Sequence, residues 1–189
     1  MKIGLYFGSF NPIHVGHLII AAHVANNADV QQVWLIVSPQ NPLKPSSVLL
    51  NEYHRLHLAK LAIDDDPKLK ISDVEFKLPK PSYTIDTLAY LKEKHPQQEF
   101  SIIIGSDSFQ NLPRWKNFDL LIRDYEFIVY QRSGYEIKDR FDAKINILHA
   151  PLLDISATVI RQNIKEGKSI RYLVPDKARE EIEMYGYYK

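Results

Sequence analysis

The chain of 189 residues, 45% hydrophobic and 25% charged, has the size and composition of one globular domain spanning residues 1–189, unlike a disordered or fibrous protein. Its 24 Lys and Arg residues against 23 Asp and Glu residues leave a net charge of +1, which excludes the strong overall field of a nucleic-acid- or membrane-binding protein. Cysteine is absent, which excludes disulfides and thiolate zinc sites, and no stretch has the length of a signal peptide or a membrane span, so we expect a cytoplasmic protein.

Apolar runs typical of strands alternate with helical patterns along the chain. The strand-like runs cover residues 3–7, 33–37, 100–104 and 127–130, and the helical patterns cover residues 17–28 and 52–63. Alternating strands and helices predict a parallel sheet, and near-continuous apolar runs indicate that helices cover both of its faces. We therefore predict an α/β fold with a doubly wound parallel sheet.

The last part of the chain is helical in character. Residues 156–166 and 176–185 have helical patterns, and Gly167 and Gly186 follow them as glycines do at helix ends. We expect this part, about residues 155–189, to form a helical cap on the sheet. Ligands of open parallel sheets bind beyond the carboxyl ends of the strands, so the functional residues should lie in the loops there.

The loop after the first strand carries the strongest functional signal. Residues 8–17, Gly-Ser-Phe-Asn-Pro-Ile-His-Val-Gly-His, lead from that strand into an apolar helical pattern. A glycine turn before a helix start can bind an anion through main-chain N–H groups and the helix dipole. Neither G-x-G-x-x-G nor G-x-x-x-x-G-K-[ST] is present, which disfavours a dinucleotide-dependent oxidoreductase and a P-loop NTPase.

Two histidines of this loop, His14 and His17, lie near the helix start, where each could donate a ring N–H to a phosphate oxygen. A metal site is less favoured, because zinc needs a third protein ligand and none is adjacent. A purely structural role is the remaining alternative. We interpret the pair as phosphate-binding.

The same residues resemble the signature of the nucleotidyltransferase superfamily, with its H-x-G-H core and an upstream [ST]-F-[DN]-P. The resemblance implies a Rossmann-like sheet and transfer of a nucleotidyl group from ATP or CTP to a phosphate-bearing acceptor, with release of pyrophosphate and use of magnesium. It also implies that the loop binds ATP through Gly8, Ser9, Phe10, His14 and His17.

Residues 81–88, Pro-Ser-Tyr-Thr-Ile-Asp-Thr-Leu, are similar to the S-Y-T-x-D-T-L of the nicotinate mononucleotide adenylyltransferases. The likeness implies that Ser82, Tyr83 and Thr84 bind the mononucleotide, with a hydroxyl and main-chain amides at a helix start receiving the pyridine carboxylate. Thr84 also fits the N-cap of the following helical pattern. The two roles are compatible.

Residues 104–115 resemble the same family through a G-x-D followed by L-x-x-W. The resemblance implies that Gly105 and Asp107 contact ATP, with Asp107 accepting hydrogen bonds from a ribose, and that Trp115 stacks on the pyridine ring. From the residues alone, Asp107 could instead be the N-cap of a short helix. Trp115 could equally fill a gap in the core.

Residues 154–161 look like the family's I-S-S-T-x-I-R. The likeness implies that Ile155, Ser156, Thr158 and Arg161 bind ATP, with the planar Arg161 guanidinium holding two oxygens of the triphosphate; a surface ion pair is its alternative. It also assigns Lys44 and Arg132 to the mononucleotide. The chain departs from the family's common pattern at four positions: Asn11 for Asp, Leu43 for His, Ser133 for Pro and Ala157 for Ser. Because Leu43 precedes Lys44, a free surface lysine is the alternative there.

The resemblance as a whole implies adenylyl transfer from ATP to nicotinate mononucleotide, which gives nicotinate adenine dinucleotide and pyrophosphate in NAD biosynthesis. His14, His17 and Arg161 would be the catalytic residues and Mg²⁺ would accompany ATP; no residue is expected to hold a resident metal. The acceptor's phosphate is already mostly dianionic at neutral pH and needs no general base. Nicotinamide mononucleotide, phosphopantetheine, cytidylyl transfer and a non-catalytic nucleotide-binding module are the alternatives. A homo-oligomer is compatible with the sequence.

Overall fold

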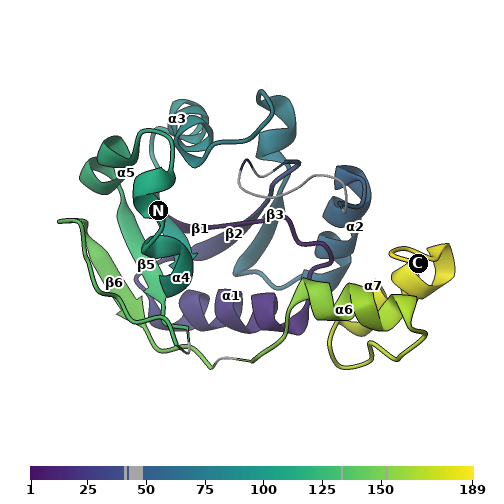
Figure 1. The fold of residues 1–189 in the computed structure, drawn as a ribbon. Helices are drawn as coiled ribbons and strands as arrows, with labels where there is room; N and C mark the ends of the chain where they lie inside the picture. Colours follow the sequence, from purple (N-terminus) through teal and green to yellow (C-terminus); the bar gives the residue numbers. More distant parts are fainter. Residues whose placement is uncertain (41, 43–48, 133, 152) are drawn as a thin grey trace.

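The computed structural model describes residues 1–40, 42, 49–132, 134–151 and 153–189. Over these ranges six strands form one sheet in the order β3-β2-β1-β4-β5-β6, and every adjacent pair is parallel. Helices lie on both faces of the sheet (Figure 1). This is a strand order of doubly wound folds, and it confirms the predicted fold class.

The bounds of the elements agree closely with the predicted ones. The strands are β1 Lys2–Gly8, β2 Gln32–Val37, β3 Leu69–Ser72, β4 Glu99–Gly105, β5 Glu126–Tyr130 and β6 Ile145–Leu148. The α-helices are α1 Val15–Asn27, α2 Glu52–Ile63, α3 Thr84–Lys94, α4 Ser106–Phe109, α5 Phe118–Asp124, α6 Ala157–Lys165 and α7 Asp176–Tyr185, with 3₁₀-helices η1 Val74–Lys77 and η2 Leu112–Arg114. β3, β6, α5, η1 and η2 have no counterpart among the elements that the sequence predicted.

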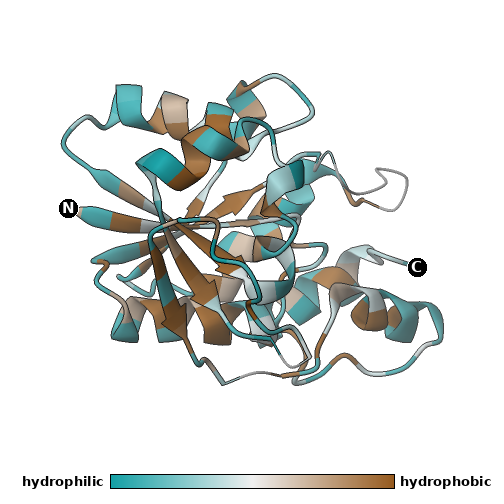
Figure 2. Ribbon diagram, turned by 60° about the vertical axis from the view of Figure 1, so that its left-hand side comes forward, coloured by the Kyte–Doolittle hydropathy of each residue, from teal (hydrophilic) through white to brown (hydrophobic). Residues whose placement is uncertain are grey.

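Each face of the sheet contributes to its own hydrophobic core. Side chains alternate along the strands, so that Tyr6 and Ile103 face one core while Leu5 and Ile102 face the other. The first core is closed by α1, α2, α6 and α7, and the second by α3 and α5. In Figure 2 the hydrophobic colour runs along the strands at the centre, and the outer helix faces are hydrophilic. None of the helices in the described ranges is long and apolar enough to cross a membrane.

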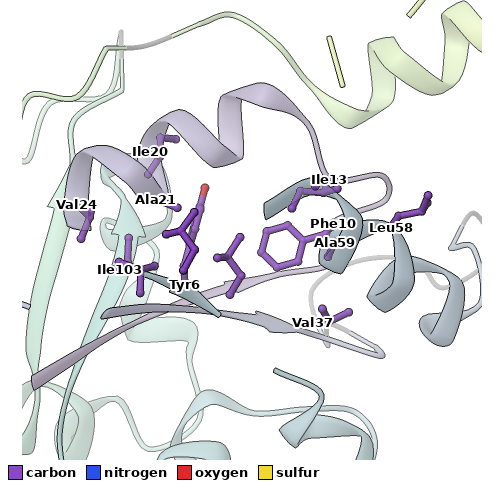
Figure 3. Packing of buried hydrophobic residues seen from close by; sticks show 14 of the residues in the cluster. Tyr6, Phe10, Ile13, Ile20, Ala21, Val24, Val37, Leu58, Ala59 and Ile103 are labelled. Carbon is purple, nitrogen blue, oxygen red and sulfur yellow. The ribbon is translucent and has the colours of Figure 1, made fainter. Parts of the chain in front are cut away.

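The loop between β1 and α1 is anchored in the first core. Phe10 and Ile13 are 2% and 0% exposed, and in Figure 3 they lie in one layer with Tyr6, below the side of α1 that carries Ile20 and Ala21. Burying a large apolar side chain contributes roughly 1.5–3 kcal/mol. The backbone of this loop therefore has a fixed position relative to the sheet.

A buried arginine, Arg55 of α2, ties two loops together. Its side chain is fully buried and donates four hydrogen bonds to main-chain carbonyl oxygens: Nε to Leu50 (2.8 Å), Nη1 to Ser9 (2.6 Å) and Ser38 (2.8 Å), and Nη2 to Pro39 (3.0 Å). Ser9 follows β1, and Ser38 and Pro39 follow β2. The guanidinium thus fixes the position of the carboxyl ends of these two strands relative to α2.

Replacing Arg55 with Met is expected to lower the free energy of unfolding by about 3 kcal/mol or more, because an apolar side chain of similar length leaves buried carbonyl oxygens without donors. Urea unfolding followed by circular dichroism measures the change. Arg123→Met is the matched control, since Arg123 is exposed and its one ion pair among the described residues is with the adjacent Asp124. An equal loss in both variants would contradict the role assigned to Arg55.

Candidate functional site

A cavity of about 540 Å³ opens at the carboxyl ends of β1 and β4. Gly8, the last residue of β1, and Ser9 line it at one strand end, and Gly105, the last residue of β4, and Asp107 line it at the other. The crossover connections leave the sheet in opposite directions from these two adjacent strands. This is the position at which doubly wound sheets bind their ligands.

The start of α3 forms another wall of this cavity through Ser82, Tyr83 and Thr84. Tyr83 is the N-cap in extended conformation, and its carbonyl oxygen accepts from the N–H groups of Asp86 (3.0 Å) and Thr87 (3.2 Å). Thr84 is therefore the first helical residue, and the expectation that it is the N-cap was wrong by one position. The helix start itself lies at the cavity, as the sequence predicted.

Trp115 lines the same end of the cavity and is half-buried, with its other side packed against the second core. The packing role considered for it is therefore observed, and stacking on the pyridine ring stays a prediction. Lys116 follows it, with Nζ 4.8 Å from the centre of the Tyr83 ring and 2.8 Å from Asp86 Oδ2. Aromatic surfaces and one ammonium group thus meet beside the start of α3.

His14 and His17 form a compact pair at the start of α1. His14 is the N-cap, its main-chain N–H donates to Nδ1 of His17 over 3.3 Å, and the two rings stack with their centres 3.6 Å apart. Because Nδ1 of His17 accepts this hydrogen bond, the neutral ring carries its proton on Nε2. A Cβ at Gly16 would lie 3.1 Å from Nδ1 of His14, so glycine leaves room for the stacked rings.

The His14 ring is neutral at physiological pH. The residue is 5% exposed, and burial, aided by the positive charge of Arg132, lowers its pKa to about 4. Its Nδ1 is buried and has no hydrogen-bond partner among the described residues. His14 can therefore offer a hydrogen bond but no charge to a ligand at neutral pH.

Arg161 reaches the histidine loop from the far end of the chain. Its Nη1 donates to the carbonyl oxygen of Asn11 over 2.7 Å, and its Nη2 lies 3.3 Å from Oγ1 of Thr158. Within the described ranges it forms no ion pair with a carboxylate, so the surface ion pair considered for it is not observed. Ser156 caps α6 by accepting from the N–H of Val159. Ile155 lies near the histidine loop, since a Cβ at Gly16 would be 3.9 Å from Cβ of Ile155.

Arg132 and Asp107 link the ends of β5 and β4. Nη1 of Arg132 lies 3.4 Å from Oδ2 of Asp107, and its main-chain N–H donates to Oγ of Ser106. Asp107 lies in the first turn of α4 behind its N-cap Gly105, so the N-cap role considered for Asp107 was wrong. A Cβ at Gly105 would lie 2.5 Å from Oδ1 of Asp107, which only glycine permits without displacing the carboxylate.

The predicted residues thus fall into two neighbouring groups. The cavity is lined by Gly8, Ser9, Ser82, Tyr83, Thr84, Gly105, Asp107 and Trp115, and its lining does not include Phe10, His14, His17, Arg132, Ile155, Ser156, Thr158 or Arg161. Tyr6 joins the two groups, because it lines the cavity and its ring meets Phe10 and His17 edge-on, at 6.0 and 6.2 Å between centres. Lys44 lies outside the described residues.

Two buried ionisable residues of the site were not predicted from the sequence, and neither were Arg114 and Lys116, which also line the cavity. Arg55 donates hydrogen bonds to the carbonyl oxygens of Ser9 and Ser38, which line the cavity. Glu75 lines the cavity itself and is only 1% exposed. Both occur in segments rich in polar residues. No local pattern distinguishes them from surface residues, because their burial depends on loops distant in sequence.

Comparisons with known proteins place the chain among nucleotide-transferring enzymes. The cytidylyltransferase-like family model matches residues 5–163. A protein of Flavobacterium psychrophilum described as a probable nicotinate-nucleotide adenylyltransferase is 51% identical, with 100% of each chain covered. A Bacteroides thetaiotaomicron protein with the same description is 38% identical, with 98% of this chain and 92% of that protein covered.

Solved structures show the same fold at lower identity. The Plasmodium falciparum nicotinic acid mononucleotide adenylyltransferase complexed with NaAD superposes with a TM-score of 0.84 at 23% identity, covering 99% of this chain and 97% of that one. A second structure of that enzyme, complexed with APC, gives a TM-score of 0.82 at 22% identity, covering 99% and 96%. At these identities the likeness establishes the fold.

Acidification is expected to reveal the buried neutral state of His14. Its pKa is about 4 in the folded chain and about 6.5 in an unfolded one, so the unfolded state gains a proton first as the pH falls. The free energy of unfolding should then decrease between about pH 6.5 and pH 4, by at most about 3 kcal/mol. Urea unfolding at several pH values should show this decrease in the wild type and not in His14→Gln. Equal pH dependence of the free energy of unfolding in both proteins would contradict the lowered pKa of His14.

Proposed function

Because this chain belongs to the nicotinate-nucleotide adenylyltransferases, within the cytidylyltransferase-like family, we propose that it transfers the adenylyl group of ATP to nicotinate mononucleotide. The products are nicotinate adenine dinucleotide, the deamido form of NAD, and pyrophosphate. The observation that carries the proposal is the cavity at the reversal point of the sheet, with an aromatic end beside α3. The histidine loop adjoins this cavity through the contact of His17 with Tyr6, and Arg161 is bonded to the same loop.

The ATP phosphates bind at the start of α1 in this proposal. The main-chain N–H groups there and the helix dipole favour an anion, and His17 adds a ring donor, since its Nδ1 is the acceptor for His14. Arg161 contributes a charged, planar group that binds two phosphate oxygens. Its present partner, the carbonyl oxygen of Asn11, keeps the guanidinium beside the loop.

The acceptor binds at the other end of the cavity. Trp115 and Tyr83 offer aromatic surfaces to the pyridine ring, and the first N–H groups of α3 favour its carboxylate. Lys116 adds a positive charge there. Gly105 and Asp107 line the stretch of cavity after β4, where Asp107 can accept hydrogen bonds from a ribose.

The reaction requires positioning and charge stabilisation. The second pKa of a phosphomonoester is about 6, so the acceptor phosphate is mostly dianionic at neutral pH. One of its oxygens forms a new bond to the α-phosphorus of ATP, the bond from that phosphorus to the bridging oxygen breaks, and its electron pair leaves with pyrophosphate. Hydrogen-bond donors and cations that are held in place before the reaction stabilise the charge that develops.

Magnesium enters the proposal as a companion of ATP. The described residues include no group of three or more His, Asp or Glu side chains placed to hold a metal ion, and Mg²⁺ is commonly bound through the phosphate oxygens of its substrate. The residues therefore fit an ion whose ligands come mainly from ATP. When bound, the ion would neutralise negative charge on the phosphates. The chain's own contribution would be Arg161 and the start of α1, which would bind the same phosphates.

A pyrophosphate-release assay tests the proposed function. Nicotinate mononucleotide, nicotinamide mononucleotide and phosphopantetheine are compared at matched concentrations with ATP and Mg²⁺, and CTP replaces ATP in a parallel series. We expect the highest kcat/KM with ATP and nicotinate mononucleotide. A higher value with phosphopantetheine or CTP would replace the proposal with that activity, and no release with any pair would indicate a non-catalytic nucleotide-binding protein.

His17→Ala is expected to lower kcat by on the order of a hundredfold or more, because it removes a donor that is already in place before the reaction. Circular dichroism should show an unchanged fold. His57→Ala is the matched control, since His57 lies on the surface of α2 and pairs with Glu181, and its kcat should stay at the wild-type level. Near-native kcat in His17→Ala would refute the role of this ring.

A further inference from the structure

A buried carboxyl group lies at the aromatic end of the cavity and has no part in the chemistry described so far. Glu75 of η1 is 1% exposed and lines the cavity together with Ser82, Tyr83 and Thr84. Oγ1 of Thr87 donates to its Oε1 over 2.9 Å. Its Oε2 is buried and accepts no hydrogen bond of good geometry from the described residues, although the hydroxyls of Ser38 and Ser82 interact with the carboxyl group closely enough to lower its pKa. A buried carboxyl oxygen in this situation is costly unless a ligand completes the site.

The surroundings of Glu75 favour its protonated form. Burial raises the pKa of the Glu75 carboxyl, and the hydroxyls of Ser38, Thr87 and Ser82, from the end of β2, from α3 and from the segment before it, hold back part of the rise. No charged side chain of the described chain contributes to this pKa.

Other charged groups line the same cavity. They are Asp107, Arg114 and Lys116, with Tyr83 as a further titratable group. Lys116 is paired with Asp86, and Asp107 with Arg132. These groups are the same for both acceptors, so the ratio of kcat/KM for the two acceptors compares them in the same surroundings.

We propose that Glu75 is a specificity-determining residue, whose Oε2 forms a hydrogen bond with the carboxylate or carboxamide on the acceptor's pyridine ring. The inference rests on the proposed function. A pyridine carboxylate offers only acceptor atoms, so the bond needs a proton on Glu75. A carboxamide has an NH₂ group that donates to the ionised Glu75 and is compatible with either form.

The two acceptors should therefore respond differently to pH. As the pH rises through the pKa of Glu75, the acid acceptor loses its hydrogen bond and meets a like charge, while the amide acceptor gains a stronger partner. We expect the ratio of kcat/KM for nicotinate mononucleotide to that for nicotinamide mononucleotide to fall by about tenfold or more. The phosphate that reacts is the same in both acceptors, so its own ionisation cancels in the ratio.

Two variants separate this role from a structural one. Glu75→Gln keeps the size of the side chain and donates through NH₂ without a titrating proton, so its ratio should be independent of pH. Thr87→Val removes the hydroxyl that favours the charged form, so the fall in the ratio should move to higher pH. Thr87 is buried and is not part of the cavity lining. Its replacement therefore changes the pKa of Glu75 without removing a group that lines the cavity.

The measurement is pyrophosphate release with both acceptors from pH 5 to 9, with thermal unfolding of each variant recorded in parallel. A pH-dependent ratio in the wild type that is flat in Glu75→Gln and displaced in Thr87→Val supports the proposal. Parallel profiles in wild type and Glu75→Gln overturn it and leave the proposed function standing. If Glu75→Gln does not fold, an undisplaced profile in Thr87→Val overturns it. Failure of both mononucleotides as acceptors would instead refute the proposed function.

Discussion

The site depends on a positive charge that is solvated by the main chain. The guanidinium of Arg55 donates to the carbonyl oxygens of Ser9, Ser38, Pro39 and Leu50, and no carboxylate of the described residues is among its hydrogen-bond acceptors. Hydrogen bonds from a charged donor are about twice as strong as neutral ones, and a planar donor group satisfies several acceptors in fixed directions. The end of β1 and the end of β2 are therefore held in a fixed arrangement, and with them Ser9 and Ser38, which line the cavity.

The histidine loop shows how the fold maintains a strained backbone at the site. Phe10 has a positive φ of 44°, which costs on the order of 1 kcal/mol or more for a residue with a side chain. Its ring is almost completely buried and lies in the first core with Ile13 (Figure 3). The free energy gained by burying the ring exceeds the cost of the strain, so the loop keeps a conformation that the local sequence alone would not favour.

The sequence predicted what local patterns encode. The helix over residues 52–63 and the helix over residues 176–185 have the bounds that were expected, and the histidine pair lies at a helix start because the motif and the helix are contiguous. β3 and β6 were missed because they are four residues long, lie at the edges of the sheet and are only partly buried.

The burial of Arg55 and Glu75 could not be predicted from the sequence for another reason. Each becomes a buried residue only when loops after β2 or residues of α3 close around it. The same holds for Arg161, which meets Asn11 across 150 positions of sequence: its role was inferred from family resemblance, since nothing near it in the chain indicates that contact. Periodicity reports the faces of single elements, and these contacts join different ones.

The distribution of charge in the site follows from burial. His14, at 5% exposure, has a pKa lowered to about 4, and burial raises the pKa of Glu75, so burial favours the neutral form of both. Rings stacked 3.6 Å apart would repel each other if both were protonated, so the geometry of the histidine pair requires that at least one ring be neutral. Cations that can attract phosphates are therefore found among the guanidinium and ammonium groups that retain contact with solvent, such as those of Arg161 and Lys116, while the neutral imidazole of His14 supplies direction. In a chain whose net charge is only +1, this division lets a few cations act on anionic substrates without raising the charge of the whole molecule.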